Sequence, residues 1–242
     1  MRLSGCLTER TELTACDRAA MLELMQRYYE NVVPAAFERD LEEKRWVIVV
    51  REPSQRLCGF STQTLVEGTA EGEPFRLLFS GDTIIDRERW GDPALAHVWG
   101  QLALTLIDQY QDLPLYWLLL SQGFRTYRFL PLFFCEFAPR HDGESSAQSR
   151  AILDAFAAPR YGSAYDAEAG VVRSHSAQYR LRQGVSEITS ARMRDPHVRF
   201  FAERNPGHSA GDELCCLAPL TRRNFTRAAY RVIGTQAALE IV

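Results

Sequence analysis

One stretch in the middle of the chain constrains the fold more than any other. Residues Pro114-Leu-Tyr-Trp-Leu-Leu-Leu120 form a nearly continuous apolar run. Such a run is typical of a strand that is buried on both faces. A strand of this kind requires a sheet with apolar cover on both sides, so the sequence predicts a mixed α and β domain.

Three further strands are expected upstream of this run. Trp46–Val50 is β-branched and is followed by the turn-like Glu52-Pro-Ser-Gln55, after which Leu57–Leu65 returns. The Gly-rich stretch from Gly68 to Pro74 then leads into Phe75–Ile85. These signals predict an antiparallel meander of three strands.

Helical periodicity separates and flanks the strands. Apolar residues recur at helical spacing over residues 15–31, 35–44, 94–110 and 121–134. Thr14-Ala-Cys-Asp17 resembles a capping box, and Asp92 followed by Pro93 suits the start of the third helix. The predicted order over the first part of the chain is therefore ααβββαβα.

Composition excludes several classes of protein. The 242 residues carry a net charge of −3 without a basic face, so no nucleic-acid partner is expected. The apolar runs are too short to span a bilayer and the N-terminus has no signal-like segment, which predicts a cytoplasmic protein without membrane contact. The six cysteines contain no C-x-x-C, so neither a disulfide framework nor a metal is expected.

One polar, Ser-rich stretch, residues 140–149, predicts a boundary. It divides the chain into a domain of residues 1–140 and a C-terminal extension of residues 141–242. Within the extension we expect helices near 148–158 and 221–233 and short strands around 170–182. The extension packs on the first domain as a lid, a degenerate half-domain or a dimerisation element, and a homodimer stays open.

The order of elements over about residues 10–140 resembles that of the GNAT superfamily of acyl-CoA-dependent N-acyltransferases. Ser80-Gly-Asp-Thr83, Gly123-Phe-Arg-Thr-Tyr127 and Arg204-Asn-Pro-Gly-His208 also resemble segments of a group of bacterial GNAT-like proteins. The resemblance implies an α+β fold with a mixed, mostly antiparallel central sheet flanked by helices.

The resemblance also implies a site for an acyl donor, the thioester of coenzyme A or of an acyl carrier protein. In the family, the loop after the third meander strand and the start of the next helix bind pyrophosphate through backbone amides. Here that loop provides Arg87, Arg89, Trp90 and Gly91 as candidate phosphate contacts. It departs from the family's Arg/Gln-x-x-Gly-x-Gly/Ala pattern, notably at Asp92-Pro93.

Candidate catalytic residues are two carboxylates and a tyrosine. Asp82 or Glu67 has the chemistry to accept a proton from an amine nucleophile. The resemblance implies that Tyr127 donates a proton to the departing thiolate. The structural alternatives are a bulge at Gly81 with Asp82 paired to a backbone group or an arginine, and a packed Tyr127.

Candidate substrate-binding residues come from two segments. Tyr116 lies in the bulky apolar set that could line an acyl tunnel or simply fill the core. Asn205, His208 and Asp212 lie in a short span rich in turn formers, for which an ordinary turn is the alternative. Outside these segments, the arginines at 125, 128 and 140 have two open roles, a contact with a phosphate-bearing ligand or carrier and surface ion pairs.

The sequence contains no G-x-S-x-G, Walker or dinucleotide motif, so hydrolase, NTPase and Rossmann oxidoreductase functions are not expected. The leading hypothesis is a GNAT-like acyltransferase that moves an acyl group from a coenzyme A or carrier-protein thioester to an amine of a small molecule or peptide. The alternative is a non-catalytic module of the same fold that binds an acyl group, a carrier or a protein partner.

Overall fold

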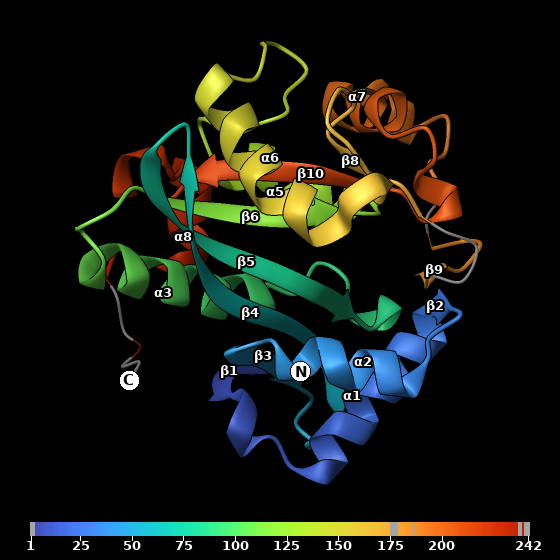
Figure 1. The fold of residues 1–242 in the computed structure, drawn as a ribbon. Helices are drawn as coiled ribbons and strands as arrows, with labels where there is room; N and C mark the ends of the chain where they lie inside the picture. Colours follow the sequence, from blue (N-terminus) through green and yellow to red (C-terminus); the bar gives the residue numbers. More distant parts are fainter. Residues whose placement is uncertain (1–2, 175–178, 186, 237–238, 240–242) are drawn as a thin grey trace.

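The computed structural model describes residues 3–174, 179–185, 187–236 and 239 (Figure 1). Its strands are β1 (Ser4–Glu9), β2 (Tyr29–Glu30), β3 (Trp46–Arg51), β4 (Leu57–Ala70), β5 (Glu73–Ile85), β6 (Leu115–Ser121), β7 (Tyr165–Asp166), β8 (Val171–Val172), β9 (Arg180–Leu181) and β10 (Glu213–Pro219). Its helices are α1 (Ala15–Tyr28), α2 (Pro34–Glu42), α3 (Ala94–Gln109), α4 (Phe124–Tyr127), α5 (Phe129–Phe133), α6 (Ala147–Tyr161), α7 (Pro196–Arg204) and α8 (Arg227–Ile233).

Eight of the strands form one sheet in the order β1-β3-β4-β5-β6-β10-β8-β7. Every neighbouring pair in it is antiparallel except β5 and β6, which run parallel. Strand β6 runs parallel to β5 because α3 carries the chain back to the end of the sheet at which β5 begins. The mixed, mostly antiparallel sheet flanked by helices that the sequence predicts is confirmed.

Helices cover both faces of this sheet (Figure 1). Alternate strand residues point to opposite faces, so Leu78 and Trp117 pack under α3 and α8, whereas Leu77 and Leu118 pack under α6. The helices α1 and α2 cover the β3–β4 part of the same face as α6. Both sides of β6 are therefore buried, as its apolar run predicts.

Helix α8 lies directly against α3. A methyl group built on Gly100 of α3 would stand 2.0 Å from Ile233 Cγ2, so the two helices approach as closely as a glycine permits. Gln101 donates a hydrogen bond to the Ile233 carbonyl at the same crossing. The contact fixes the end of the chain's last helix on the central sheet.

The segment after residue 140 contributes to the sheet itself. Strand β10 pairs with β6 from Leu214↔Ser121 to Pro219↔Tyr116, and β8 pairs with the start of β10. The sheet thus runs across the boundary expected at residues 140–149.

Several elements differ from the predicted order. Strand β1 precedes the first helix, and its mixed burial gives it no clear apolar alternation. The helix expected to reach residue 31 ends at Tyr28, because Tyr29 and Glu30 pair with β9. The capping box is confirmed: Thr14 Oγ1 accepts a hydrogen bond from Asp17 N, and the Asp17 carboxylate accepts one from Thr14 N.

Candidate functional site

The sheet opens between its two parallel strands. Strands β5 and β6 pair from Arg76↔Leu115 to Ser80↔Leu119, and no described pair joins them beyond that point. Strand β5 continues to Ile85, while β6 remains paired with β10 on its other side. The result is a V-shaped opening in the sheet, called here the splay.

A β-bulge lies where the splay begins. Ser61 pairs with Thr83 and Gln63 with Ser80, so Gly81 and Asp82 together oppose Thr62. Such a bulge leaves one residue outside the ladder and turns its side chain. A side chain at Gly81 would stand 2.6 Å from Thr62 Oγ1 and 2.8 Å from Lys44 Cε, which explains the glycine.

A chain of buried polar side chains reinforces the bulge on the α3 face. The indole N–H of Trp117 donates to Ser80 Oγ at 2.8 Å, and Ser80 donates to Gln63 Oε1 at 2.6 Å. Gln63 then donates to Ser61, whose hydroxyl bonds that of Thr83. A fully satisfied buried network of this kind holds the strands in one geometry.

A small cavity lies beside this network. It has a volume of about 30 Å³ and is lined by Ser80 and Gly81 of β5, Leu119 of β6, and Ala96 and Trp99 of α3. Since a water molecule occupies roughly 30 Å³ of liquid, this cavity is matched to a very small group. Tyr116 does not line this cavity, because its side chain points to the other face and packs under α6.

The opposite face of the splay carries carboxylates and tyrosines. Asp82 accepts a hydrogen bond from Tyr179 at 3.1 Å, and the Tyr179 ring meets Tyr29 edge to face at 5.4 Å between centroids. Glu213 begins β10 next to the free end of β6 and points to the same face as Cys215, which packs under α6. We call Asp82, Glu213, Tyr29 and Tyr179 the acidic cluster.

Burial and mutual repulsion perturb this cluster. Burial, and the charge of nearby Asp40, raise the pKa of Asp82 to about 6. Burial and the charges of Asp82 and Asp40 raise the pKa of Glu213 to about 8. Lys44 is paired with Asp40 at 2.6 Å and partly offsets the repulsion. The two carboxyl groups of the acidic cluster, Asp82 and Glu213, therefore have pKa values on either side of neutral pH, as an acid–base site requires.

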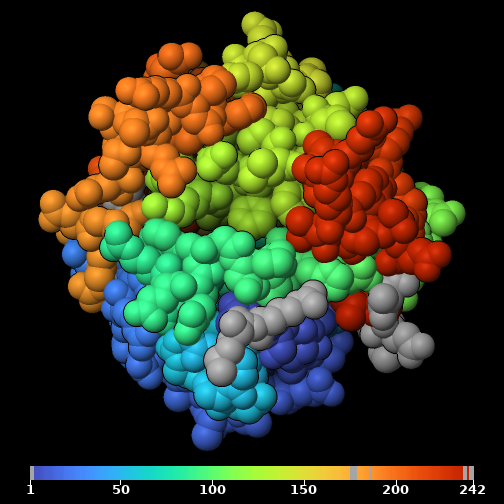
Figure 2. All heavy atoms as spheres, turned by 180° about the vertical axis from the view of Figure 1, so that it is seen from behind, coloured from blue at the N-terminus to red at the C-terminus, as the bar shows by residue number. Residues whose placement is uncertain are grey.

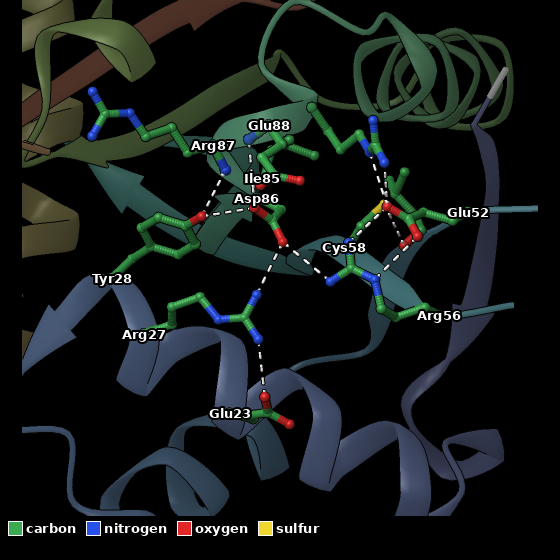
Figure 3. Close-up of polar contacts among 12 residues, drawn as sticks. Glu23, Arg27, Tyr28, Glu52, Arg56, Cys58, Ile85, Asp86, Arg87 and Glu88 are labelled. Carbon is green, nitrogen blue, oxygen red and sulfur yellow. Dashed lines mark hydrogen bonds and ion pairs between the residues drawn. The ribbon is translucent and has the colours of Figure 1, made fainter. Parts of the chain in front are cut away.

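The loop after β5 is anchored by its first residue, Asp86 (Figure 3). The buried Asp86 carboxylate accepts hydrogen bonds from Arg27 at 3.0 Å, Arg56 at 3.2 Å and the Tyr28 hydroxyl at 2.8 Å. Tyr28 in turn accepts a hydrogen bond from the backbone N–H of Arg87. These contacts fix the loop to α1 and to the β3–β4 turn.

The predicted phosphate contacts in this loop differ in their surroundings. Arg89 pairs with Glu52 at 2.8 Å, and Arg56 also binds Glu52, which holds the pKa of this carboxyl down to about 2. Arg87 is exposed and lies 5.6 Å from the ring centroid of Trp90. The indole N–H of Trp90 is bonded to the Ile85 carbonyl, so its ring is fixed in place.

The start of α3 carries its own carboxylate. The helix begins at Ala94, and Asp92 Oδ1 accepts the Ala94 N–H at 2.9 Å. Gly91 has φ +94°, which favours glycine at this turn. A negative charge thus already occupies the positive end of the helix.

The other two predicted catalytic residues, Glu67 and Tyr127, do not join the acidic cluster. Glu67 lies on an exposed stretch of β4 and pairs with Arg76 at 2.6 Å. Arg76 lies on β5, six residues before Asp82. Six strand residues span about 20 Å, so Glu67 and Asp82 do not act on one atom. Tyr127 is fully buried and its hydroxyl donates to the Pro139 carbonyl at 3.0 Å.

The predicted substrate loop is a closed structural turn. Asn205 is buried and donates to the Asp212 carbonyl, while the Asp212 carboxylate accepts from Arg173 at 2.9 Å and from Ser174 N. His208 is half-buried, and burial lowers its pKa. The loop leads directly into Glu213 at the start of β10, and Gln122, which follows β6, donates to the Gly211 carbonyl.

Sequence reasoning found Asp82 but missed the rest of the acidic cluster. Glu213 directly follows Asp212 and the turn formers before it, so its sequence context is that of a turn and not of a strand. Tyr29 and Tyr179 meet only in the folded chain. In the described part of the chain, no group of three His, Cys, Asp or Glu side chains is placed to hold a metal ion, and no helix there could cross a membrane.

No family model and no curated protein matches the sequence. Among solved structures, a conserved protein of Enterococcus faecalis described as a probable N-acyltransferase matches 55% of this chain and 33% of its own, at 13% identity and a TM-score of 0.42. A GNAT family N-acetyltransferase from Escherichia coli in complex with CoA matches 59% of this chain and 74% of its own, at 15% identity and a TM-score of 0.40. A Trypanosoma brucei acetyltransferase matches 60% of this chain and 96% of its own, at 13% identity and a TM-score of 0.38. The chain is thus similar to these proteins in part of its fold, and the first match spans only a third of the Enterococcus protein.

Proposed function

We propose that this protein transfers a short acyl group from a thioester, carried by coenzyme A or an acyl carrier protein, to an amine of a small molecule or peptide. The observation that carries the proposal is the splay, with a small cavity on its α3 face and the acidic cluster on the other. Donor and acceptor then approach one reaction centre from opposite faces of the sheet.

The acidic cluster suits an amine acceptor. Alkyl amines reach the site as ammonium ions, which a concentration of carboxylates attracts. Asp82, with a pKa of about 6, is ionised at neutral pH and takes the proton that makes the amine nucleophilic. The nitrogen lone pair then attacks the thioester carbonyl carbon and the C–S bond breaks. The proton that the nitrogen loses as the amide forms neutralises the departing thiolate.

The bulge suits the acyl donor. A residue left outside the ladder at Gly81–Asp82 presents backbone polar groups to the splay, where a backbone N–H would stabilise the oxyanion of the tetrahedral intermediate. The cavity volume of about 30 Å³ leaves no room for a long acyl chain and favours the shortest acyl groups. We assign no proton transfer to Tyr127, because its hydroxyl is already bonded to Pro139.

The test measures release of free thiol from acetyl-CoA, longer acyl-CoAs and an acylated carrier protein, in the presence of a panel of amines. The wild type is compared with Asp82→Asn and with Glu67→Gln as the matched carboxylate outside the splay. Amine-dependent thiol release that falls in Asp82→Asn and persists in Glu67→Gln is the expected result. The absence of turnover with every donor and amine would refute the transferase.

A second candidate is a binding module without turnover. The observation in its favour is Asp92, whose carboxylate caps the helix end that would otherwise attract a pyrophosphate. In that case acyl donors or carriers bind and protect the fold, but no amine releases thiol. Binding measured by calorimetry beside the thiol assay separates the two candidates.

A further inference from the structure

The C-terminal part of the chain encloses a second cavity, larger than the one at the splay. It has a volume of about 250 Å³ and lies between α6, α7, the turn that joins β7 to β8, and the loop that precedes α6. It shares no lining residue with the cavity at the splay, and each of its lining residues is Pro139 or a later one. We call this space the α6–α7 cavity.

The inner surface of the α6–α7 cavity is apolar. Leu153 of α6 and Cys215 of β10 are buried there, and Phe200 of α7 is partly buried beside them. Helical spacing places polar groups next to this surface, because Arg150 shares a face of α6 with Leu153, and Arg204 shares a face of α7 with Phe200. The cavity therefore combines an apolar floor with charged side chains, as ligand sites commonly do.

The loop that precedes α6 is tied to the rest of the fold on one side of the cavity. Its Pro139 carbonyl accepts a hydrogen bond from the Tyr127 hydroxyl at 3.0 Å. Its His141 ring stacks on the His197 ring of α7, with 4.4 Å between the centroids. Figure 2 shows the orange segment that contains α7 beside the yellow-green segment before α6.

The other walls of the cavity are also bonded to one another. The Tyr165 hydroxyl of β7 donates to the Asp154 carboxylate of α6 at 2.7 Å. Arg204 of α7 donates to the Glu168 carbonyl, in the turn between β7 and β8, at 2.9 Å. Since these contacts need no ligand, the cavity is formed in advance of binding, which lowers the entropic cost of binding.

Two arginines at the cavity have no acidic partner among the residues that the structure describes. Arg150 donates through Nη1 to the Ser145 carbonyl at 2.8 Å, and Arg204 donates through Nη2 to the Glu168 carbonyl. Ser145 and Glu168 both line the cavity, so each guanidinium is held at its wall. A guanidinium has five N–H donors, and one bond leaves most of them for an anion.

The carboxylates at the cavity are either occupied or not held in place. Asp154 already accepts the tyrosine hydroxyl, and Asp142 neutralises Arg140 through an N–H···O bond of 2.7 Å. Glu144 and Glu168 are exposed, and no described hydrogen bond or ion pair holds their carboxylates at the cavity. The charges that are both fixed at the wall and unpaired are therefore positive.

We propose that the α6–α7 cavity binds a small organic acid with a compact apolar body. Arg150 and Arg204 hold the carboxylate, to which guanidinium groups bind in a bidentate manner, and the body lies on the apolar floor. A volume of about 250 Å³ is below the roughly 300–1,000 Å³ of sites for drug-sized ligands, so the acid is smaller than these. This inference goes beyond the proposed transfer reaction and does not depend on it.

The test is isothermal titration calorimetry at neutral pH and fixed ionic strength. The probes are hexanoate, 4-methylpentanoate and 3-phenylpropionate, which carry linear, branched and aromatic bodies, and acetate, which has almost none. The acid that binds most tightly is then compared with its primary amide and with the amine of the same body. These two compounds keep the apolar contact and replace the negative charge with no charge or with a positive one.

The variants are Arg150→Gln, Arg204→Gln and the combination of both. Arg199→Gln is the matched control, because Arg199 is an exposed arginine of α7 that does not line the cavity. Asp82→Asn is the control for binding at the splay. All of the altered arginines are exposed, so the variants should fold, and melting temperatures without ligand verify this.

The expected result is that at least one acid binds the wild type at least about tenfold more tightly than acetate, its own amide and its own amine. The double arginine variant should weaken the Kd for this acid by about tenfold or more, because it loses charge-assisted hydrogen bonds. Arg199→Gln and Asp82→Asn should change it less than twofold. The single variants show how the two arginines share the carboxylate.

The proposal is overturned if none of the acids binds, if the amide or the amine binds as tightly as the acid, or if the double variant binds the acid as the wild type does. Equal weakening in Arg199→Gln would also overturn it, since a general loss of positive charge would then be the cause. None of these readouts requires thiol release, so failure of the transferase and failure of this site are observed separately.

Discussion

Replacing Glu213 with glutamine should make the protein more stable at alkaline pH. The Glu213 side chain has no hydrogen-bond or ion-pair partner among the described residues, and its charged form faces the carboxylates of Asp82 and Asp40. A pKa of about 8 in the folded state, against the ordinary 4.5, means that the folded protein holds the Glu213 proton more tightly than the unfolded chain. Below pH 4.5 Glu213 is protonated in both the folded and the unfolded chain, and it causes no penalty. As pH rises through about 8 the folded chain must hold its charge beside other carboxylates, and this stability is lost.

The magnitude follows from the same difference. At about 1.4 kcal/mol per pKa unit, a rise from 4.5 to about 8 corresponds to about 5 kcal/mol. Glu213 keeps some solvent contact, which screens its charge, so we expect on the order of 2 kcal/mol. Glutamine has the same shape but no charge, so the penalty should be absent in the variant.

The assay is urea denaturation of wild type and Glu213→Gln at pH 5, 7 and 9. The free energy of unfolding of the variant should exceed that of the wild type by an amount that grows with pH and reaches on the order of 2 kcal/mol at pH 9. Glu203→Gln, which changes an exposed carboxylate of α7, is the control and should show no such trend. A difference between Glu213→Gln and wild type that stays constant from pH 5 to pH 9 would refute the reasoning.

Three further predictions test the site and the packing. Asp82→Asn should lower kcat roughly 100-fold or more and abolish the rise of kcat with pH near 6, measured as thiol release from pH 5 to 8. Tyr127→Phe should cost about 1 kcal/mol of stability through its lost bond to Pro139, while kcat stays unchanged; a large loss of kcat would instead restore Tyr127 to catalysis. Gly100→Ala should lower stability by roughly 1–3 kcal/mol because its methyl group meets Ile233, and an unchanged urea midpoint would show that α8 moves freely.

The sequence predicted the elements whose periodicity is strong. The apolar face of α3, the β-branched Trp46–Val50 and the continuous apolar run of β6 each determine a buried surface locally. Strand β10 was missed because its run Glu213–Pro219 directly follows a turn-forming segment. Its pairing with β6 is set by tertiary packing.

The site was predictable to the same limited depth. Asp82 stands out because a carboxylate beside a glycine in a strand predicts a bulge, and the bulge is present. Arg87 and Trp90 were proposed because the resemblance assigns phosphate contacts to their loop, and that role stays a prediction. Arg125 was recognised only as one of several arginines. Its stacking on Trp90 joins α4 to the loop after β5, 35 residues earlier in the chain, and no local pattern encodes such a contact.

The position of β10 has a consequence for how the chain is made. During synthesis, strands β1 to β6 leave the ribosome first, and the edge of β6 then lacks the partner that arrives with residues 213–219. An unpaired, strongly apolar edge is a template for association with other chains. The nascent protein therefore passes through an interval in which its most apolar strand is half covered, and its yield in a cell should depend on chaperone capacity and on the rate of elongation over the following 90 or so residues.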